Sequence, residues 1–392
     1  MLDFNKITVL DLETTIKAPT PHFGASPTYP SNRIVMLGYQ SGEAEDILTD
    51  RGEIEQFTEE MRRDEHLIVG HNIAFDILYL ARYGLELGHN PIWDTQKFAY
   101  IQHGRKLVQP SLETVAKSFR LPFRKDTEIK ERFKAGIGAD EIDRELLEDY
   151  LHSDVRVTKQ IFDKQYAWLS QQPEQIQSYY LEMLNGIGVT SQMTHVGFEF
   201  DTGGATKQSK KTHLVAMERE ESLIKRYKDI YPGEFNPNSA AQIETLLWGG
   251  EVNVPIVEEV LDEEGNPVRY KSGEKKGQIK TRKAVRKQRV EPMVKPETIK
   301  LFENRGWEKK AGAKTLEYIQ KYEEDSPAED LCFEIEILRQ VSKSISTYYR
   351  PYISFAVDYT LHPSYNHCVT QTGRLSSSKP NMQNINGKKE SE

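Results

Sequence analysis

Four acidic residues and a tyrosine have the types and spacings of a catalytic centre. Asp11 and Glu13 lie two residues apart at the end of a β-prone stretch, so a strand would point both to the same face. Tyr150 and Asp154 lie four apart in a helical pattern, which places them on one face of the helix. Asp76 follows another apolar stretch, where a helix begins. Together these side chains could bind metal ions and activate water.

Carboxylates that meet at one edge of a sheet repel each other and raise each other's pKa values unless cations lie between them. Hard divalent cations with oxygen ligands, Mg²⁺ or Mn²⁺, suit this set. Two such ions about 3.5–4 Å apart form a phosphoryl-transfer site. Tyr150 would orient the attacking water, because a phenol with a pKa near ~10 is poorly suited as a base at neutral pH. Each pair alone is more typical of solvated or core residues, so the hypothesis depends on the joint pattern.

Alternating strand and helix patterns would position these side chains. The stretches 6–12, 32–40 and 66–72 are short and β-prone, and the third runs directly into a helical pattern. A long helical stripe covers residues 144–170. The alternation predicts an α/β domain over about the first 190 residues, in which strand ends and adjoining helices meet at one edge.

The size and composition of the chain narrow its class. A length of 392 residues predicts two or three domains, and a net charge of −8 argues mildly against nucleic acid as a partner. No apolar run approaches the ~20 residues of a membrane helix, and the N-terminal stretch is not typical of a signal peptide. The two cysteines, Cys332 and Cys368, have no metal-type spacing. These features predict a reduced, cytoplasmic protein.

Three segments that carry the candidate residues, "VLDLETT", "GHNIAFD" and "YLHSD", resemble the exonuclease motifs of the DEDD 3′–5′ exonucleases in the tyrosine-bearing subtype. The resemblance covers about residues 5–170. It implies a ribonuclease H-like domain with a mixed sheet and two bound Mg²⁺ or Mn²⁺ ions. It also implies that Tyr150 acts on the nucleophilic water. The implied metal ligands are Asp11, Glu13, Asp76 and Asp154.

The same resemblance assigns roles to residues between the acids. Asn72 matches a position that contacts the single-stranded 3′ end of the substrate. The segment "WDTQKFAY", which contains Asp94, is similar to a segment between the second and third motifs. His71 and His152 lie inside the motifs, but the family gives them no fixed role, and we predict none.

The rest of the chain resembles the family A DNA polymerases of the bacterial DNA polymerase I and phage-replicase type. The segments "MTHVGFEFD", "FNPNSAAQIETLL" and "ILRQVSKSISTYY" occur in the family's order, followed by "HPSYNHCVTQTGRLSSSKPNMQNIN". The first three imply a mostly helical, thumb-like domain and the base of a palm. The fourth implies the first palm motif, in which Arg374 would contact the primer–template duplex.

We therefore predict an exonuclease domain at 1–188, a thumb-like domain at 189–357 and an incomplete start of a palm at 358–392. The polymerase aspartates and fingers that follow in the family have no counterpart in this sequence. Either a second polypeptide supplies them or the chain is a truncated product. The resemblance is compatible with a phage or a bacterium as the source.

A basic stretch interrupts the acidic average of the thumb-like region. Ten lysines and arginines lie between Arg269 and Arg289, opposed by a single glutamate, and Gly265-Asn266 just upstream favours a hairpin. Such a basic hairpin or insertion near 265–290 could grip DNA phosphates without sequence preference. A solvated charged hairpin is the alternative. The candidate DNA-binding residues here are Arg282, Lys283, Arg286 and Lys287.

Three functional hypotheses follow. The first is a metal-dependent 3′–5′ DNA exonuclease that serves as the proofreading portion of a family A polymerase. The second is a non-catalytic DNA-binding and scaffolding subunit of a split polymerase. The third is an RNA exonuclease, since the nuclease motifs also occur in RNA-trimming enzymes. The chain alone is not expected to extend primers.

Overall fold

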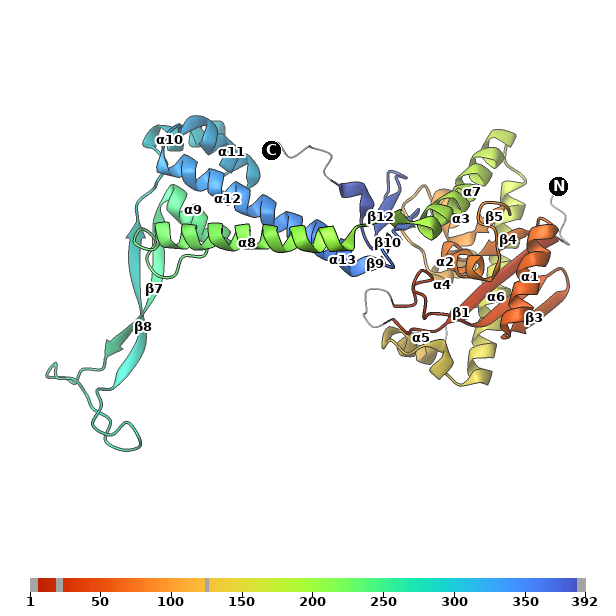
Figure 1. The fold of residues 1–392 in the computed structure, drawn as a ribbon, viewed down its shortest axis with the longest axis horizontal. Coiled ribbons are helices and arrows are strands. Elements are labelled where there is room, and N and C mark those ends of the chain that lie inside the picture. Colours follow the sequence, from red (N-terminus) through yellow and green to blue (C-terminus); the bar gives the residue numbers. More distant parts are fainter. Residues whose placement is uncertain (1–5, 19–23, 124–126, 386–392) are drawn as a thin grey trace. The chain divides into compact units, whose positions relative to one another are not determined.

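The computed structural model describes residues 6–18, 24–123 and 127–385. The chain divides into two compact units, one formed by residues 1–202 with 351–392 and the other by residues 203–350 (Figure 1). The boundaries of these units differ from those of the predicted domains, since the described residues 351–385 group with the N-terminal part of the chain. The fold class is mixed α/β, as expected.

The first unit is built on a five-stranded mixed sheet in the order β3-β2-β1-β4-β5. Strands β1 (Ile7–Thr14), β2 (Ile34–Ser41) and β3 (Ala44–Leu48) are antiparallel neighbours. Strands β4 (Leu67–Gly70) and β5 (Ile92–Asp94) extend the sheet in parallel with β1. The three β-prone stretches of the sequence correspond to β1, β2 and β4.

Both faces of this sheet are buried by helices. One face packs against α6 (Arg144–Leu169), and its core includes Ile7 and Val9 of β1. The core on the other face includes Leu10 and Leu12. The helices and 3₁₀ segments of this part are α1 (Arg51–Arg63), α2 (Ala74–Leu80), η2 (Ala81–Tyr83), α3 (Thr95–Gln102), α4 (Leu112–Ser118), α5 (Thr127–Lys134), η3 (Ala139–Glu141), α6 and α7 (Glu174–Val196).

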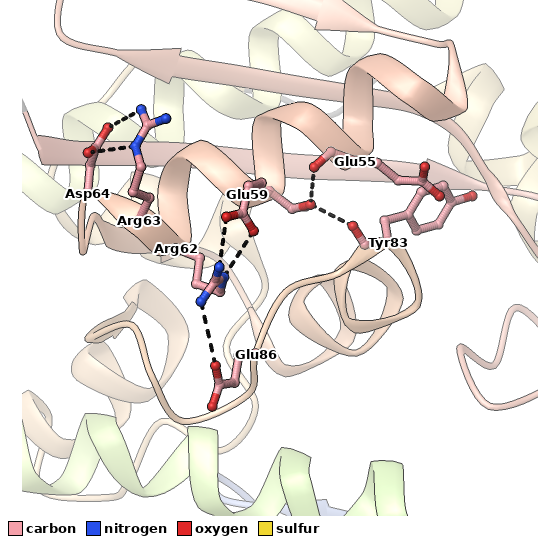
Figure 2. A network of polar contacts seen from close by, with 8 residues as sticks. Glu55, Glu59, Arg62, Arg63, Asp64, Tyr83 and Glu86 are labelled. Carbon is pink, nitrogen blue, oxygen red and sulfur yellow. Dashed lines mark hydrogen bonds and ion pairs between the residues drawn. The ribbon is translucent and has the colours of Figure 1, made fainter.

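Helix α1 carries a network of charges on its surface (Figure 2). Arg62 pairs with Glu59 at 2.7 Å and lies 4.0 Å from Glu86, and Arg63 pairs with Asp64 at 3.1 Å. These side chains are exposed, so the pairs contribute little to stability. None of the candidate site residues belongs to this network.

Residues 351–385 complete the first unit with short strands. Strands β6 (Phe198–Glu199), β9 (Ala356–Val357) and β10 (Thr360–Leu361) form one small sheet, in the order β6-β10-β9. Strands β11 (Ser364–Asn366) and β12 (Ser376–Ser378) form a second, followed by the 3₁₀ segment η5 (Met382–Asn384).

The second unit is mostly helical and has its own apolar core. Its helices are α8 (Thr202–Tyr227), α9 (Ala240–Trp248), α10 (Pro296–Arg305), α11 (Ala313–Tyr322) and α12 (Pro327–Lys343), followed by the π-helical segment η4 (Ser344–Tyr349). Helix α13 (Arg350–Phe355) starts at the last residue of this unit, and its other residues belong to the first unit. A two-stranded ribbon, β7 (Gly250–Glu259) and β8 (Thr281–Val290), interrupts the helices. Within the described ranges, no helix combines the length and the hydropathy that a membrane crossing requires.

Candidate functional site

Helix α6 crosses the central sheet very closely at the level of Asp11. Asp11 pairs with Gly38 of β2, and Leu151 of α6 packs directly over this glycine. A Cβ atom added at residue 38 would lie 2.7 Å from Leu151 Cγ, well inside van der Waals contact. The glycine therefore permits the close approach, and it brings the helix that carries Tyr150 and Asp154 down onto the strand pair that carries Asp11.

The pleat of β1 points the two N-terminal acids towards this helix. Asp11 and Glu13 alternate in register with Ile7 and Val9, whose side chains share a core with Tyr150 of α6. Glu13 is 8% exposed, and Asp11 is half-buried. The predicted common face of the two acids is thus the α6 face of the sheet.

Asp76 lies in the first turn of α2, just beyond β4, and is fully buried. Burial is the main cause that raises its pKa well above the ordinary value, and the negative charge of Asp11 is the next. Asp94 and Glu13 add smaller contributions, and a hydrogen bond to the backbone of Asp76 opposes them. Asp11, Glu13 and Asp76 therefore lie close enough for their charges to act on one another.

Tyr150 and Asp154 lie on α6, the helix that covers the sheet face of Asp11 and Glu13. Both are buried on α6, and the ring of Tyr150 lies 6.4 Å from that of Phe133 in α5, measured between centroids. They approach the sheet face that carries Asp11 and Glu13, because α6 packs against β1, β2 and β4.

The donor set suits a hard divalent cation. Desolvated carboxylates that raise each other's pKa are stabilised by a positive charge between them, and carboxylate oxygens are the ligands that Mg²⁺ and Mn²⁺ prefer. Across residues 6–18, 24–123 and 127–385, however, no three His, Cys, Asp or Glu side chains are already spaced as a metal site. That Asp11, Glu13, Asp76 and Asp154 bind metal therefore stays a prediction.

The loop between β4 and α2 is held in place by the start of α3. Asn72 has a left-handed backbone conformation, with φ of 63°, and its backbone N–H donates to Asp94 Oδ1 at 3.0 Å. His71 contacts the Thr95 hydroxyl through Nδ1 at 2.9 Å and the Pro110 carbonyl oxygen through Nε2 at 3.0 Å. His71, for which no role was predicted, therefore helps to anchor the loop that carries Asn72.

His152, the histidine of the third motif, contacts a different part of the unit. His152 Nδ1 lies 2.7 Å from Glu45 Oε1, and Arg156 pairs with the same carboxylate at 2.8 Å. Burial alone would raise the pKa of Glu45, but the hydrogen bonds and electrostatic interactions with Arg156 and His152 together lower it. This cluster joins α6 to β3 and gives His152 a structural part.

A cavity of about 180 Å³ adjoins Asn72. Its lining includes Phe75 of α2, Ser191 of α7, and Tyr365 and Asn366 of β11. Within the described part of the chain, the Ser191 hydroxyl is buried without a hydrogen-bond partner. The cavity thus offers aromatic rings, an amide and an unsatisfied hydroxyl beside the loop of the second motif.

The remaining predicted site residues lie apart from this edge. Arg374 is in the loop between β11 and β12, where its carbonyl oxygen accepts from the Thr370 hydroxyl at 2.8 Å. The four basic candidates of the second unit lie on β8, which pairs with β7 over ten residues. The turn predicted at Gly265-Asn266 occurs between the bridged residues Leu261 and Pro267, beyond the end of the main ribbon.

The basic side chains of the ribbon differ in whether they pair with an acidic residue. Arg282 pairs with Glu258 at 3.3 Å, and Lys287 pairs with Glu251 at 2.9 Å. Among the described residues, Lys283 and Arg286 have no such acidic partner. The sequence could not reveal this division, because it depends on which residue of β7 faces each residue of β8.

Comparison with protein families finds a match for the C-terminal third of the chain. Residues 267–392 match the model of the DNA polymerase family A. No curated protein matches the chain significantly. The whole fold is similar to the solved POL domain of Pol1 from M. smegmatis, in complex with DNA primer-template and dNTP, with a TM-score of 0.58 and 14% sequence identity. The match covers 98% of this chain and 53% of that structure, so the chain spans about half the length of its structural relative.

Proposed function

We propose that the chain is a metal-dependent 3′–5′ DNA exonuclease that forms the proofreading part of a family A DNA polymerase. The observation that carries the proposal is the placement of the acids: Asp11 and Glu13 share the β1 face that α6 covers with Tyr150 and Asp154, and the buried Asp76 follows the adjacent strand β4. The raised pKa of Asp76, caused first by burial and then by the charge of Asp11, agrees with this placement. The family match of residues 267–392 and the polymerase-like fold support the polymerase context. The reaction would release nucleoside 5′-monophosphates.

In this proposal the chain's own residues bind the metal ions, orient the attacking water and exclude bulk solvent. Asp11, Glu13, Asp76 and Asp154 would hold two divalent cations. When bound, these cations lower the pKa of a water and offset charge on the leaving 3′ oxygen. The Tyr150 hydroxyl would orient that water towards the phosphorus. The burial of Asp76 and Asp154 keeps bulk solvent from the carboxylates, which strengthens every charge interaction at the site.

The substrate end would enter beside Asn72. The adjoining cavity brings two aromatic rings and several hydrogen-bonding groups to the loop of the second motif, which suits unstacked bases of a single strand. In a duplex the bases are paired and stacked, so the end of a duplex would have to fray first. We therefore expect a preference for single-stranded and mismatched 3′ ends.

The first test is direct hydrolysis by the purified chain. Single-stranded DNA with a 5′ label should shorten stepwise in Mg²⁺ or Mn²⁺, and Asp11→Ala combined with Glu13→Ala should abolish this activity. An intact activity in the double variant would show that the site is wrong. Tight DNA binding without any metal-stimulated cleavage would instead favour a non-catalytic, scaffolding role, and faster cleavage of a matched RNA would favour RNA as the substrate.

We propose that the ribbon and Arg374 contribute DNA contacts. Lys283 and Arg286 have no acidic partner among the described residues, so they can bind phosphates at lower cost than Arg282 and Lys287. Arg374 lies in the segment that matches the polymerase family, and an arginine can reach base edges in a groove. That a second polypeptide supplies a polymerase active site stays a prediction.

The ribbon contacts have a measurable salt signature. Lys283→Ala with Arg286→Ala should weaken duplex binding and reduce the slope of log K against log salt by about 1.8, because each lost phosphate contact removes about 0.9. Fluorescence anisotropy over a salt series measures this slope. The matched control removes two exposed charges elsewhere in the second unit, Lys300→Ala with Lys314→Ala, and should leave the slope unchanged. Equal slopes in all three proteins would exclude the ribbon as a DNA contact.

A further inference from the structure

Asp94 occupies a special place beside the loop of the second motif. It ends β5 and pairs with Gly70, the last residue of β4, so the two parallel strands deliver their following residues to the same edge. Its side chain is buried, 4% exposed, in a part of the unit where burial raises the pKa of the carboxyl. Burial of a carboxylate costs solvation free energy, and hydrogen bonds from three backbone amides offset part of this cost here.

A single oxygen of Asp94 accepts all three of these hydrogen bonds. The amides of Gln96 and Lys97, at 2.8 and 3.2 Å, belong to the first turn of α3, so Asp94 is the N-cap of this helix. The third amide, at 3.0 Å, is that of Asn72, which is remote in sequence. One carboxylate thus ties the loop of the second motif to the end of a helix.

The conformation that this bond holds is an uncommon one. Asn72 has a positive φ, which is uncommon outside glycine although asparagine adopts it more readily than most residues, and the hydrogen bond to Asp94 favours it here. Asn72 lines the cavity together with Phe75 and Tyr365. A rotation of its backbone would move the amide side chain away from that position.

We propose that Asp94 is a positioning residue of the nuclease, which holds the Asn72 backbone so that the Asn72 amide side chain meets the 3′-terminal nucleotide of single-stranded DNA. This inference rests on the proposed function. Asp94 acts through the loop, and it neither binds metal nor touches the reacting phosphorus. Its loss should therefore weaken substrate binding more than it slows the chemical step.

Asp94→Ser separates the two duties of this side chain. Serine is a good N-cap, so α3 keeps its cap, but the shorter side chain no longer reaches the Asn72 amide. We expect KM for single-stranded DNA to rise about tenfold, the loss of one buried hydrogen bond, while kcat changes less than about twofold. Asp94→Asn, which keeps an acceptor oxygen at the same length, should restore KM to near the wild-type value.

A double variant separates positioning from general damage to the fold. If Asp94 acts through Asn72, Asp94→Ser should add nothing to the KM of Asn72→Ala, whereas two independent effects would multiply. Asp50→Ala is the matched control, because Asp50 is also an aspartate N-cap in the first unit, accepting from Gly52 and Glu53 amides on α1, with no contact to the loop. It should lower stability and leave KM unchanged.

The outcomes distinguish this inference from the function on which it rests. If the wild-type chain does not hydrolyse DNA under any metal condition, the proposed function fails and the inference fails with it. If the wild type hydrolyses DNA and Asp94→Ser leaves KM unchanged, or its effect multiplies with that of Asn72→Ala, the positioning role alone is overturned. Circular dichroism of each variant verifies that α3 and the rest of the unit remain folded.

Discussion

Asp76→Asn should reduce metal-dependent DNA hydrolysis by about a thousandfold or more, and the same variant should be more stable than the wild type without metal. The loss of activity follows from removing a carboxylate that would hold the cations, since several kcal/mol of transition-state stabilisation correspond to this factor. Single-turnover hydrolysis at saturating Mg²⁺ measures the loss.

The gain in stability follows from the electrostatics of the site. Burial and the charges of Asp11, Asp94 and Glu13 all raise the pKa of Asp76, which means that they disfavour its ionised form. Asparagine has nearly the same shape without the charge. In EDTA we expect the melting temperature to rise by about 2–4 °C, the shift that 1 kcal/mol produces in a unit of this size.

Asp64→Asn is the control for both measurements. Asp64 is an exposed acid at the end of α1 that pairs with Arg63, away from the sheet edge. Its substitution should change neither hydrolysis nor the melting temperature appreciably. An Asp76→Asn variant that keeps full activity would remove Asp76 from the site, and one that melts lower in EDTA would contradict the charge coupling.

The strands and helices that carry the site could be read from local patterns. The β-prone stretches correspond to β1, β2 and β4, and the stripe from residue 144 corresponds to α6. The helix start at Ser326 was also predictable, because the Ser326 hydroxyl accepts from the Glu329 amide and Pro327 follows it. These features depend on neighbours within one or two turns, so the sequence contains all the information that they need.

Contacts between distant segments could not be read in this way. The need for glycine at residue 38 depends on where α6 crosses the sheet, and the hydrogen bond from Asn72 to Asp94 depends on the alignment of β4 with β5. The pairing of Arg282 with Glu258 depends on the register of the ribbon. Each of these facts needs a long-range alignment that a single sequence does not specify.

The docking of the C-terminal segment onto α3 and α7 is the largest feature that local patterns missed. Lys97 of α3 is buried, and its ammonium group donates to the Met183 carbonyl oxygen and to His367 Nδ1, the second at 2.9 Å. His367 Nε2 in turn lies 2.7 Å from the Thr190 hydroxyl of α7. Because Nδ1 faces an ammonium group, it must accept, so the neutral ring carries its proton on Nε2.

This arrangement should make the docking sensitive to acid. Burial, and then the positive charge of Lys97, lower the pKa of His367 to about 3, from an ordinary value of 6.5. Burial lowers the pKa of Lys97 itself to about 8, partly offset by Asp94, so the ammonium form still prevails at neutral pH. The unfolded chain therefore binds a proton at residue 367 between pH 6.5 and about 3, and the folded chain does not.

The sign of the effect follows from this difference in bound protons. The contribution of a neutral His367 to stability is fully present above about pH 6.5, and it is lost as the pH falls towards 3, by about 1.4 kcal/mol for each pH unit. His367→Gln keeps an acceptor for Lys97 and a donor for Thr190 but has no proton to gain. Between pH 6.5 and 4.5 the wild type should therefore lose about 2–3 kcal/mol more unfolding free energy than this variant.

Urea titrations of the whole chain at several pH values measure this difference, and the comparison cancels the carboxylates, including Asp94, that titrate in both proteins. His89→Gln replaces an exposed histidine of the same unit and should follow the wild type at every pH. Parallel loss of stability in the wild type and His367→Gln would mean that the ring is protonated in the folded chain. A charged His367 ring would then lie beside the Lys97 ammonium group. The assignment of a neutral His367 that accepts from Lys97 and donates to Thr190 would be wrong.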